Sequence, residues 1–148
     1  MMTRALLLIT RFVTGSLFVI AGWSKLSRPV QEFQYVIESY QIFPNFVIPV
    51  MAHVVPWVEF ILGAFLILGY LRRLSAGILS VLCAGFIGLL TSAVVRGIDL
   101  GNCGCFGESI HLTPLQALGV DTCLLIALLY LVMNKKRVLD LDEWLTQP

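Results

Sequence analysis

Four long apolar stretches, separated by short polar ones, set the pattern of the chain. They cover about residues 5–23, 47–70, 74–95 and 113–133. Crossing the hydrocarbon core of a bilayer takes roughly 20 helical residues, so each stretch is long enough to span it as a helix. In the first stretch Arg11 interrupts the apolar run and no small-residue cleavage site follows, which favours a retained helix over a signal peptide. The pattern predicts an all-α membrane protein, a four-transmembrane-helix bundle.

A shorter element is expected between the first two spans. From Ser24 to Phe46 apolar residues recur at helical spacing among polar ones, and Pro29 and Pro44 bracket the segment. It is too short and too polar to span a membrane. The sequence therefore predicts an interfacial amphipathic helix that lies along the membrane surface. A helix that caps the bundle is the plainer interpretation, and the two are compatible.

The composition agrees with lipid as the solvent for most of the chain. The 148 residues are 58% hydrophobic and 13% charged, whereas soluble domains usually carry about 25% charged residues. The mean hydropathy is +0.89, and the formal net charge of +1 gives no indication of a nucleic-acid partner. We expect one membrane domain, residues 1–134, embedded in the lipid bilayer, and a cytoplasmic tail, residues 135–148.

Basic residues near the span ends predict the orientation. Six of them fall on one side of the predicted bundle and three on the other; the six are Arg4, Arg72, Arg73, Lys135, Lys136 and Arg137, and the three are Lys25, Arg28 and Arg96. The side richer in Lys and Arg is usually cytoplasmic. Both termini are therefore expected in the cytoplasm, and in a bacterium the loop between the last two spans would face the periplasm from the inner membrane.

The candidate chemistry lies in that loop, whose residues 99–108 read DLGNCGCFGE. Cys103 and Cys105 are one residue apart, and a disulfide in so small a ring is strained and therefore oxidising. The loop's glycines allow the close backbone approach that a partner thiol needs. The periplasm also permits disulfides to persist, so a redox role is indicated. A static disulfide, or a metal site completed by His111, remains an alternative.

Three charged side chains, those of Arg11, Glu59 and Asp121, fall within predicted spans. A charge in the bilayer core is costly, so such residues usually face the bundle interior. Arg11 is expected either to extend to the interface or to pair with Glu59 across antiparallel helices. Glu59 would then be half of a structural ion pair, or else a proton relay, and Pro56 before it can kink the helix.

Small residues inside the spans predict where helices meet. Glycine positions should permit close helix approach; they are Gly15, Gly22, Gly77, Gly85 and Gly88. Cys83 and Cys123 fall at similar depth in the third and fourth spans, where lone cysteines usually behave as small buried hydrophobic residues.

The order of these features resembles the DoxX-like superfamily of four-helix membrane proteins. The matching positions are Arg11, Gly15, Phe18, Ala21, Gly22, Lys25 and Leu26, then Ser39, Tyr40, Phe43 and Pro44, then Pro56, Glu59, Gly63 and Gly69. The run Cys103-Gly104-Cys105-Phe106-Gly107 narrows the resemblance to the MauE branch. The resemblance implies a redox-associated inner-membrane protein. MauE is linked to maturation of the disulfide-rich small subunit of methylamine dehydrogenase, alongside a thioredoxin-like periplasmic partner, and DoxD relatives are linked to quinone reduction.

We therefore predict a thiol-disulfide redox protein in which Cys103 and Cys105 oxidise a thioredoxin-like partner and return electrons to a quinone. His53, Trp57 and Asp121 are the predicted neighbours of that quinone, although a satisfied packing role is the plainer interpretation of the histidine. The opposite electron direction is equally compatible with the motif. DsbB and VKOR offer an analogy of architecture, but they use two cysteine pairs. The alternative is a non-catalytic scaffold or a copper- or zinc-handling module.

Overall fold

The computed structural model describes residues 2–98 and 113–134, and within these it contains helices and no strand. The helices are α1 (Met2–Leu26), α2 (Val30–Ser39), α3 (Ile48–Leu68), α4 (Arg72–Val95) and α5 (Pro114–Met133). The predicted all-α architecture is confirmed. The predicted division into residues 1–134 and a tail stays a prediction, because residues 135–148 lie outside the described part.

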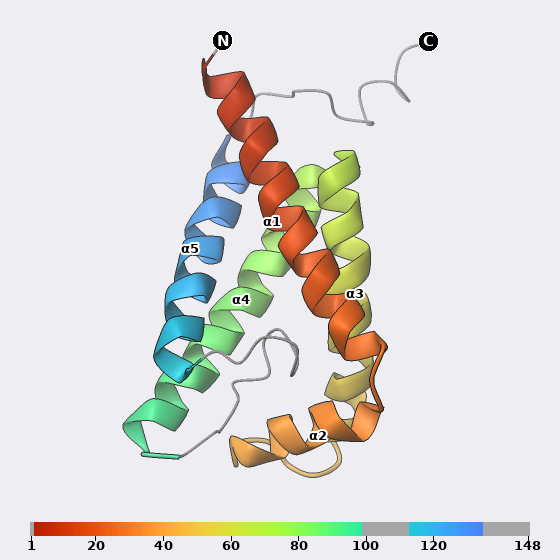
Figure 1. The fold of residues 1–148 in the computed structure, drawn as a ribbon, viewed down its shortest axis with the longest axis vertical. Coiled ribbons are helices and arrows are strands. Elements are labelled where there is room, and N and C mark those ends of the chain that lie inside the picture. The colour runs from red at the N-terminus through yellow and green to blue at the C-terminus, as the bar shows by residue number, and fades with distance from the viewer. Residues whose placement is uncertain (1, 99–112, 135–148) are drawn as a thin grey trace.

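The long helices form two neighbouring pairs, α1 with α3 and α4 with α5 (Figure 1). Each runs opposite to the one before it, so α1 begins and α5 ends at one end of the bundle, which we call the terminal end. The short helix α2 lies across the other end, which we call the α2 end (Figure 1). The end of α4 and the start of α5, which residues 99–112 connect, are also at the α2 end.

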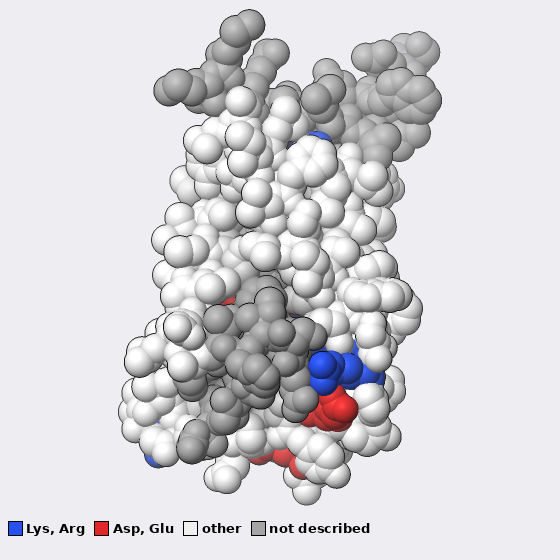
Figure 2. All heavy atoms as spheres, in the orientation of Figure 1, with Lys and Arg blue, Asp and Glu red and all other residues white. Residues whose placement is uncertain are grey.

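Four of the described helices are long and apolar enough to cross a membrane: Ala5–Leu26, Ile48–Leu68, Arg72–Val95 and Leu115–Met133. On the face in Figure 2 the middle of the bundle is almost uncharged, and most of the visible charged side chains gather toward the α2 end. Large apolar side chains such as Ile9, Val81 and Ile126 point outward along the spans. In water such a surface would be unfavourable, so the protein is a multi-span membrane protein.

The helix α2 packs against the bundle with its apolar face. Phe33 and Ile37 are buried and share a cluster with Ile48, Ala52 and Val55 of α3. The structure thus confirms that this segment caps the bundle, and its placement along the membrane surface, which is compatible with capping, stays a prediction. The helix is shorter than the predicted segment 24–46. Residues 24–26 of that segment belong to α1, and residues 40–46 follow α2 without forming a helix.

Helix ends at the terminal end are secured by backbone and arginine hydrogen bonds. Gly69, at φ 74°, ends α3, and the next N–H, that of Tyr70, donates to the carbonyl of Phe65 at 3.0 Å. This is a Schellman arrangement, which favours glycine because its left-handed φ costs other residues energy. Arg72 and Arg73 then donate to the carbonyls of Asn134 and Val132 at the end of α5, where positive charge complements the helix dipole.

The expected start of α5 is also confirmed. Thr113 is the N-cap: its hydroxyl accepts from the backbone N–H of Gln116 at 3.4 Å, and the Gln116 side chain accepts from the N–H of Thr113 at 3.1 Å. This reciprocal capping box satisfies two donors that the first turn leaves without helical partners. It fixes the point at which the chain re-enters the bundle after residues 99–112.

The glycine prediction is right for α1 and wrong for α4. A Cβ atom at Gly22 would lie 2.7 Å from the Phe60 nitrogen and 2.8 Å from the Pro56 oxygen, so the α1 and α3 backbones touch there. By contrast, nothing lies within 4 Å of a Cβ added at Gly77, Gly85 or Gly88. Small residues permit close packing only where a neighbouring helix faces them, and the sequence does not say which face that is.

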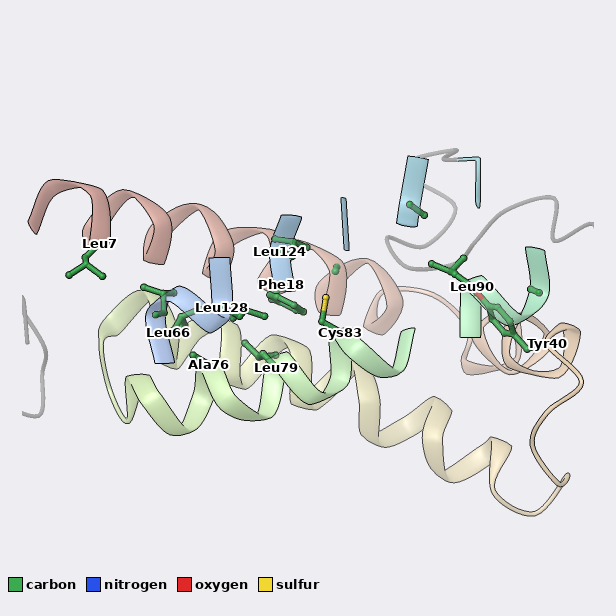
Figure 3. Close-up of a cluster of buried hydrophobic side chains, with 14 residues drawn as sticks. Leu7, Phe18, Tyr40, Leu66, Ala76, Leu79, Cys83, Leu90, Leu124 and Leu128 are labelled. Carbon is green, nitrogen blue, oxygen red and sulfur yellow. The ribbon is translucent and has the colours of Figure 1, made fainter. Parts of the chain in front are cut away.

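The core of the bundle is a leucine-rich cluster drawn from all four spans (Figure 3). Its buried members include Leu7, Phe18, Leu66, Leu79, Cys83, Leu90 and Leu128. Tyr40, just after α2, belongs to the same cluster, and Ile98, just after α4, packs against it. The α2 end is therefore continuous with the main core.

Candidate functional site

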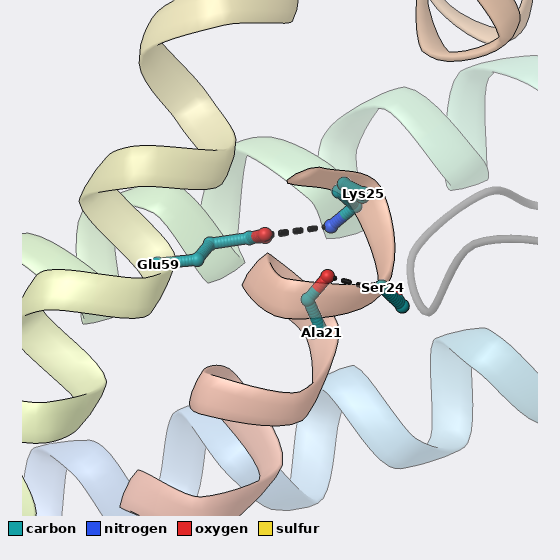
Figure 4. A network of polar contacts seen from close by, with 4 residues as sticks. All are labelled: Ala21, Ser24, Lys25 and Glu59. Atoms are coloured by element: carbon teal, nitrogen blue, oxygen red, sulfur yellow. Dashed lines mark hydrogen bonds and ion pairs between the residues drawn. The ribbon is translucent and has the colours of Figure 1, made fainter. Parts of the chain in front are cut away.

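A buried ion pair joins α1 to α3 near the α2 end. The Lys25 ammonium nitrogen lies 2.7 Å from one Glu59 carboxylate oxygen and 2.9 Å from the other, and Figure 4 shows the two side chains pointing toward each other across the helix interface. Lys25 is 5% exposed and Glu59 is 2% exposed. Two opposite charges so close together relieve much of the cost of burying either one alone.

The helix contact described above positions this pair. Lys25 follows Gly22 by three residues on α1, and Glu59 follows Pro56 by three residues on α3. Residues three apart share a helix face, so the close approach of Gly22 to Pro56 brings the two charged side chains to the same interface. The helix α3 continues through Pro56 to Leu68.

Two aromatic rings complete the surroundings of the ammonium group. Its nitrogen lies 5.3 Å from the ring centre of Phe33 on α2 and 5.4 Å from that of Phe86 on α4. Both distances allow cation–π attraction, which strengthens when water is excluded. The Lys25 side chain thus contacts groups on α2, α3 and α4 from its place on α1. These contacts link α1, α2, α3 and α4 at the α2 end of the bundle.

The predicted pairing of Glu59 with Arg11 is wrong. At a rise of about 1.5 Å per residue, Arg11 and Lys25 are roughly 21 Å apart along α1, so a carboxylate that contacts one cannot reach the other. Arg11 is 4% exposed, which also excludes the expected extension to the bundle surface, and its guanidinium carbon lies 5.5 Å from the Phe12 ring centre. Lys25 was missed because the predicted span ends at residue 23.

The two described cysteines differ in their surroundings. Cys83 is buried, as predicted, and its thiol donates to the backbone oxygen of Asp121 at 3.1 Å. Cys123 is exposed, so the expectation that it is buried is wrong. Both are free thiols. The Asp121 side chain is buried, in agreement with the expectation that a charged residue in a span faces the interior.

The three residues predicted to surround a quinone do not converge on one place. His53 and Trp57 lie one turn apart on the exposed face of α3, where Trp57 is 54% exposed. A ring nitrogen of His53 lies 2.8 Å from the backbone oxygen of Pro49, which satisfies the imidazole within its own helix. Asp121 is buried on α5. None of the three lines the cavity between α2, α3 and α4 or the one between α1 and α5 in the described part of the chain.

The predicted reactive loop lies outside the described residues. This applies to Cys103, Gly104, Cys105, Phe106 and Gly107. Among residues 2–98 and 113–134, no three histidine, cysteine, aspartate or glutamate side chains gather as a metal site would require. The alternative metal site that includes His111 falls in the same undescribed segment.

The flanks of that loop are described, and both are at the α2 end. The Arg96 guanidinium, at the end of α4, donates to the backbone oxygen of Tyr40. Ile98 packs against the main core, and Thr113 caps α5. The loop therefore leaves and re-enters the bundle at the end that holds the Lys25–Glu59 pair.

Comparisons with known proteins give a consistent family result. The family described as "Methylamine utilisation protein MauE" matches residues 3–134. Protein TlpB of Flavobacterium psychrophilum is 30% identical over 140 residues, which cover 90% of this chain and 38% of that protein. The methylamine utilization protein MauE of Paracoccus denitrificans is 34% identical over 100 residues, 68% of this chain and 53% of that protein.

The chain spans only part of the length of these relatives, and no solved structure matches it. The resemblance to the MauE branch is confirmed by the family match. The wider DoxX-like assignment stays a prediction.

Proposed function

The chain belongs to the MauE family, and from this membership and the Cys103-Gly104-Cys105 run we propose that it exchanges disulfides with a thioredoxin-like partner, assisting the maturation of periplasmic proteins. The observation that carries the proposal is the placement of two thiols, one residue apart, in a loop whose flanks are anchored at the α2 end. Such a pair can form a mixed disulfide and resolve it without a third thiol.

The exchange balances as follows. A partner with two thiols transfers two electrons and two protons to the Cys103–Cys105 disulfide, so that the partner's thiols become a disulfide and the loop cysteines become thiols. To restore the loop disulfide, an acceptor must take two electrons and two protons. A membrane quinone, which becomes the quinol, accepts both and is available from the bilayer. The reverse direction, in which the loop reduces the partner, uses the same residues.

The Lys25–Glu59 pair supports the exchange indirectly. It holds α1, α2, α3 and α4 together beneath the flanks of the loop, because one ammonium group contacts the carboxylate and both aromatic rings. A second role is proton transfer between the two groups, which are within hydrogen-bond distance. Stability measurements separate the two roles, since only the first predicts a loss of fold when either charge is removed.

The orientation in the membrane provides the first test. With both termini in the cytoplasm of the bacterial inner membrane, a membrane-impermeant maleimide should label Cys103 and Cys105 in intact cells after mild reduction. The Cys103→Ala/Cys105→Ala double variant, which keeps Cys83 and Cys123, should not be labelled. A reporter that is active only in the cytoplasm should be active when it is fused after Arg73 or at the C-terminus.

The single-cysteine variants extend this test to function. In Cys103→Ala and Cys105→Ala the remaining loop thiol can displace one thiol from the disulfide of the oxidised partner but has no neighbouring loop thiol to resolve the new bond. One of the two variants should therefore accumulate a mixed disulfide with the partner, visible as a reducible band of higher mass. Wild-type protein and the double variant are the controls, because both should show little or none. If the maleimide reaches neither loop cysteine from outside, or no mixed disulfide forms in either single variant, the proposal is wrong.

A further inference from the structure

An elongated cavity of about 480 Å³ lies between α2, α3 and α4. Its lining is apolar and aromatic and includes Phe33, Tyr40, Val81, Gly85 and Phe86. A volume of several hundred Å³ is typical of small-molecule sites. His53, Trp57 and Asp121 do not line this cavity. It is therefore a different site from the one expected from the sequence.

The cavity has two unlike ends. Along α4 its lining residues run from Ile78 to Leu89, roughly 16 Å at 1.5 Å per residue. Near the Ile78 end it is bordered by Val81, which is 74% exposed on the lipid-facing surface. At the other end it meets Tyr40, whose backbone oxygen accepts the hydrogen bond from Arg96. The cavity thus extends from the outer surface of the spans to Tyr40, which is hydrogen-bonded to Arg96 at the end of α4.

The inner wall of the cavity is shared with the buried ion pair. Phe33 and Phe86 line the cavity, and the same two rings contact the Lys25 ammonium. A ligand seated there would lie against rings whose positions are held by a buried cation. The aromatic wall of the cavity is thus also part of the surroundings of the buried ion pair.

We propose that this cavity binds a membrane quinone, with the ring toward Tyr40 and the isoprenoid tail leaving past Val81 into the lipid. The choice of quinone rests on the proposed function, which needs a two-electron acceptor that enters from the bilayer. An uncharged ring can enter an apolar cavity at low cost, whereas the charged head group of a phospholipid cannot be desolvated without ionic partners. Flat aromatic walls also suit a planar ring better than a flexible acyl chain.

Filling the cavity tests this directly. Gly85 lines it, and a Cβ added there meets nothing within 4 Å, so Gly85→Leu should occupy ligand space without disturbing the backbone. Gly88→Leu is the matched control: it lies on the same helix, also has nothing within 4 Å of an added Cβ, and does not line the cavity. Both changes replace a helical glycine by a better helix former.

The measurement is equilibrium binding of decylubiquinone to purified protein in nanodiscs that contain phospholipid alone. Wild type and Gly88→Leu should bind with similar affinity, and Gly85→Leu should bind at least about tenfold more weakly, equivalent to 1.4 kcal/mol. Thermal melting of both variants verifies that the fold is retained. Equal binding by Gly85→Leu and wild type, or a cavity that retains only phospholipid when the quinone is offered, would overturn the proposal.

The same binding is measured in the Cys103→Ala/Cys105→Ala variant. Because the lining residues that the structure describes lie on α2, α3 and α4 and just after α2, its affinity should equal that of wild type. Cavity-dependent quinone binding together with an absence of thiol exchange would refute the proposed function and leave the quinone site. Intact thiol exchange without quinone binding at the cavity would refute the site and leave the exchange.

Discussion

Glu59→Gln is expected to lower the free energy of unfolding by about 3–5 kcal/mol, the cost of leaving a buried charge without its partner in soluble proteins. Lys25 is 5% exposed in the wild-type protein. In the variant its ammonium group would lose its counter-ion and keep the cation–π contacts with Phe33 and Phe86. Lys25→Met should be destabilising for the corresponding reason at the carboxylate. The measurement is denaturant unfolding of the purified protein in a fixed detergent.

A double-mutant cycle isolates the pair from the other effects of each substitution. Lys25→Met/Glu59→Leu removes both charges and should recover most of the lost stability, because well-packed apolar residues often replace a buried pair without loss. Glu38→Gln is the control, since Glu38 is exposed on α2 and should change stability by no more than about 0.5 kcal/mol. If Glu59→Gln unfolds like wild type and keeps full activity, neither the structural role nor proton transfer holds.

Replacing either loop cysteine is expected to have the largest effect on activity. Cys103→Ala and Cys105→Ala should each reduce the oxidation of a thioredoxin-like partner to the background rate, because a single loop cysteine cannot form the Cys103–Cys105 disulfide that takes the partner's two electrons and two protons. Partner thiols are counted with a chromogenic reagent during a single turnover. Cys123→Ala is the control: this exposed thiol lies on α5 and its removal should leave the rate unchanged.

Residual single-turnover oxidation in either loop variant would show that the Cys103–Cys105 disulfide is not the oxidant of the partner. A loss of activity in Cys123→Ala would point instead to a second cysteine pair, the feature by which DsbB and VKOR differ from the scheme proposed for this chain.

The spans could be predicted because lipid imposes a simple rule on the sequence. A helix exposed to hydrocarbon must be apolar over about 20 residues, so length and composition alone are enough to find α1, α3, α4 and α5. The start of the last span at residue 113 can be predicted for a similar reason, since a threonine followed by proline at the first helical position is a local signal. Neither inference needs knowledge of how the helices pack.

The partner of Glu59 could not be predicted in the same way. Which side chains meet depends on helix register, which in turn depends on the contact of Gly22 with Pro56. The sequence contained a usable signal: Gly22 and Pro56 each stand three residues before a charged residue of opposite sign. The predicted first span ends at residue 23, so Lys25 falls outside it and is not weighed as a partner for a residue inside the bundle.

Helix faces were the other point at which the sequence was insufficient. The glycines of α4 look like those of α1, yet Gly85 and Gly88 face open space while Gly15 and Gly22 touch α3. His53 and Trp57 were expected near a quinone from depth alone, and they lie on the exposed face of α3. Depth follows from residue position, but rotation about the helix axis follows from packing against particular neighbours.

The most direct test of the central claim is quinone reduction coupled to thiol oxidation. Purified protein in nanodiscs is mixed, without oxygen, with the reduced thioredoxin-like partner that the mixed disulfide identifies, and with decylubiquinone, and the quinol and the partner disulfide are both quantified. The account predicts one quinol for each partner disulfide, and no quinol above background with Cys103→Ala or Cys105→Ala. Quinol formation that is unaffected by loss of the loop cysteines, or no quinol formation by the wild-type protein, would contradict it.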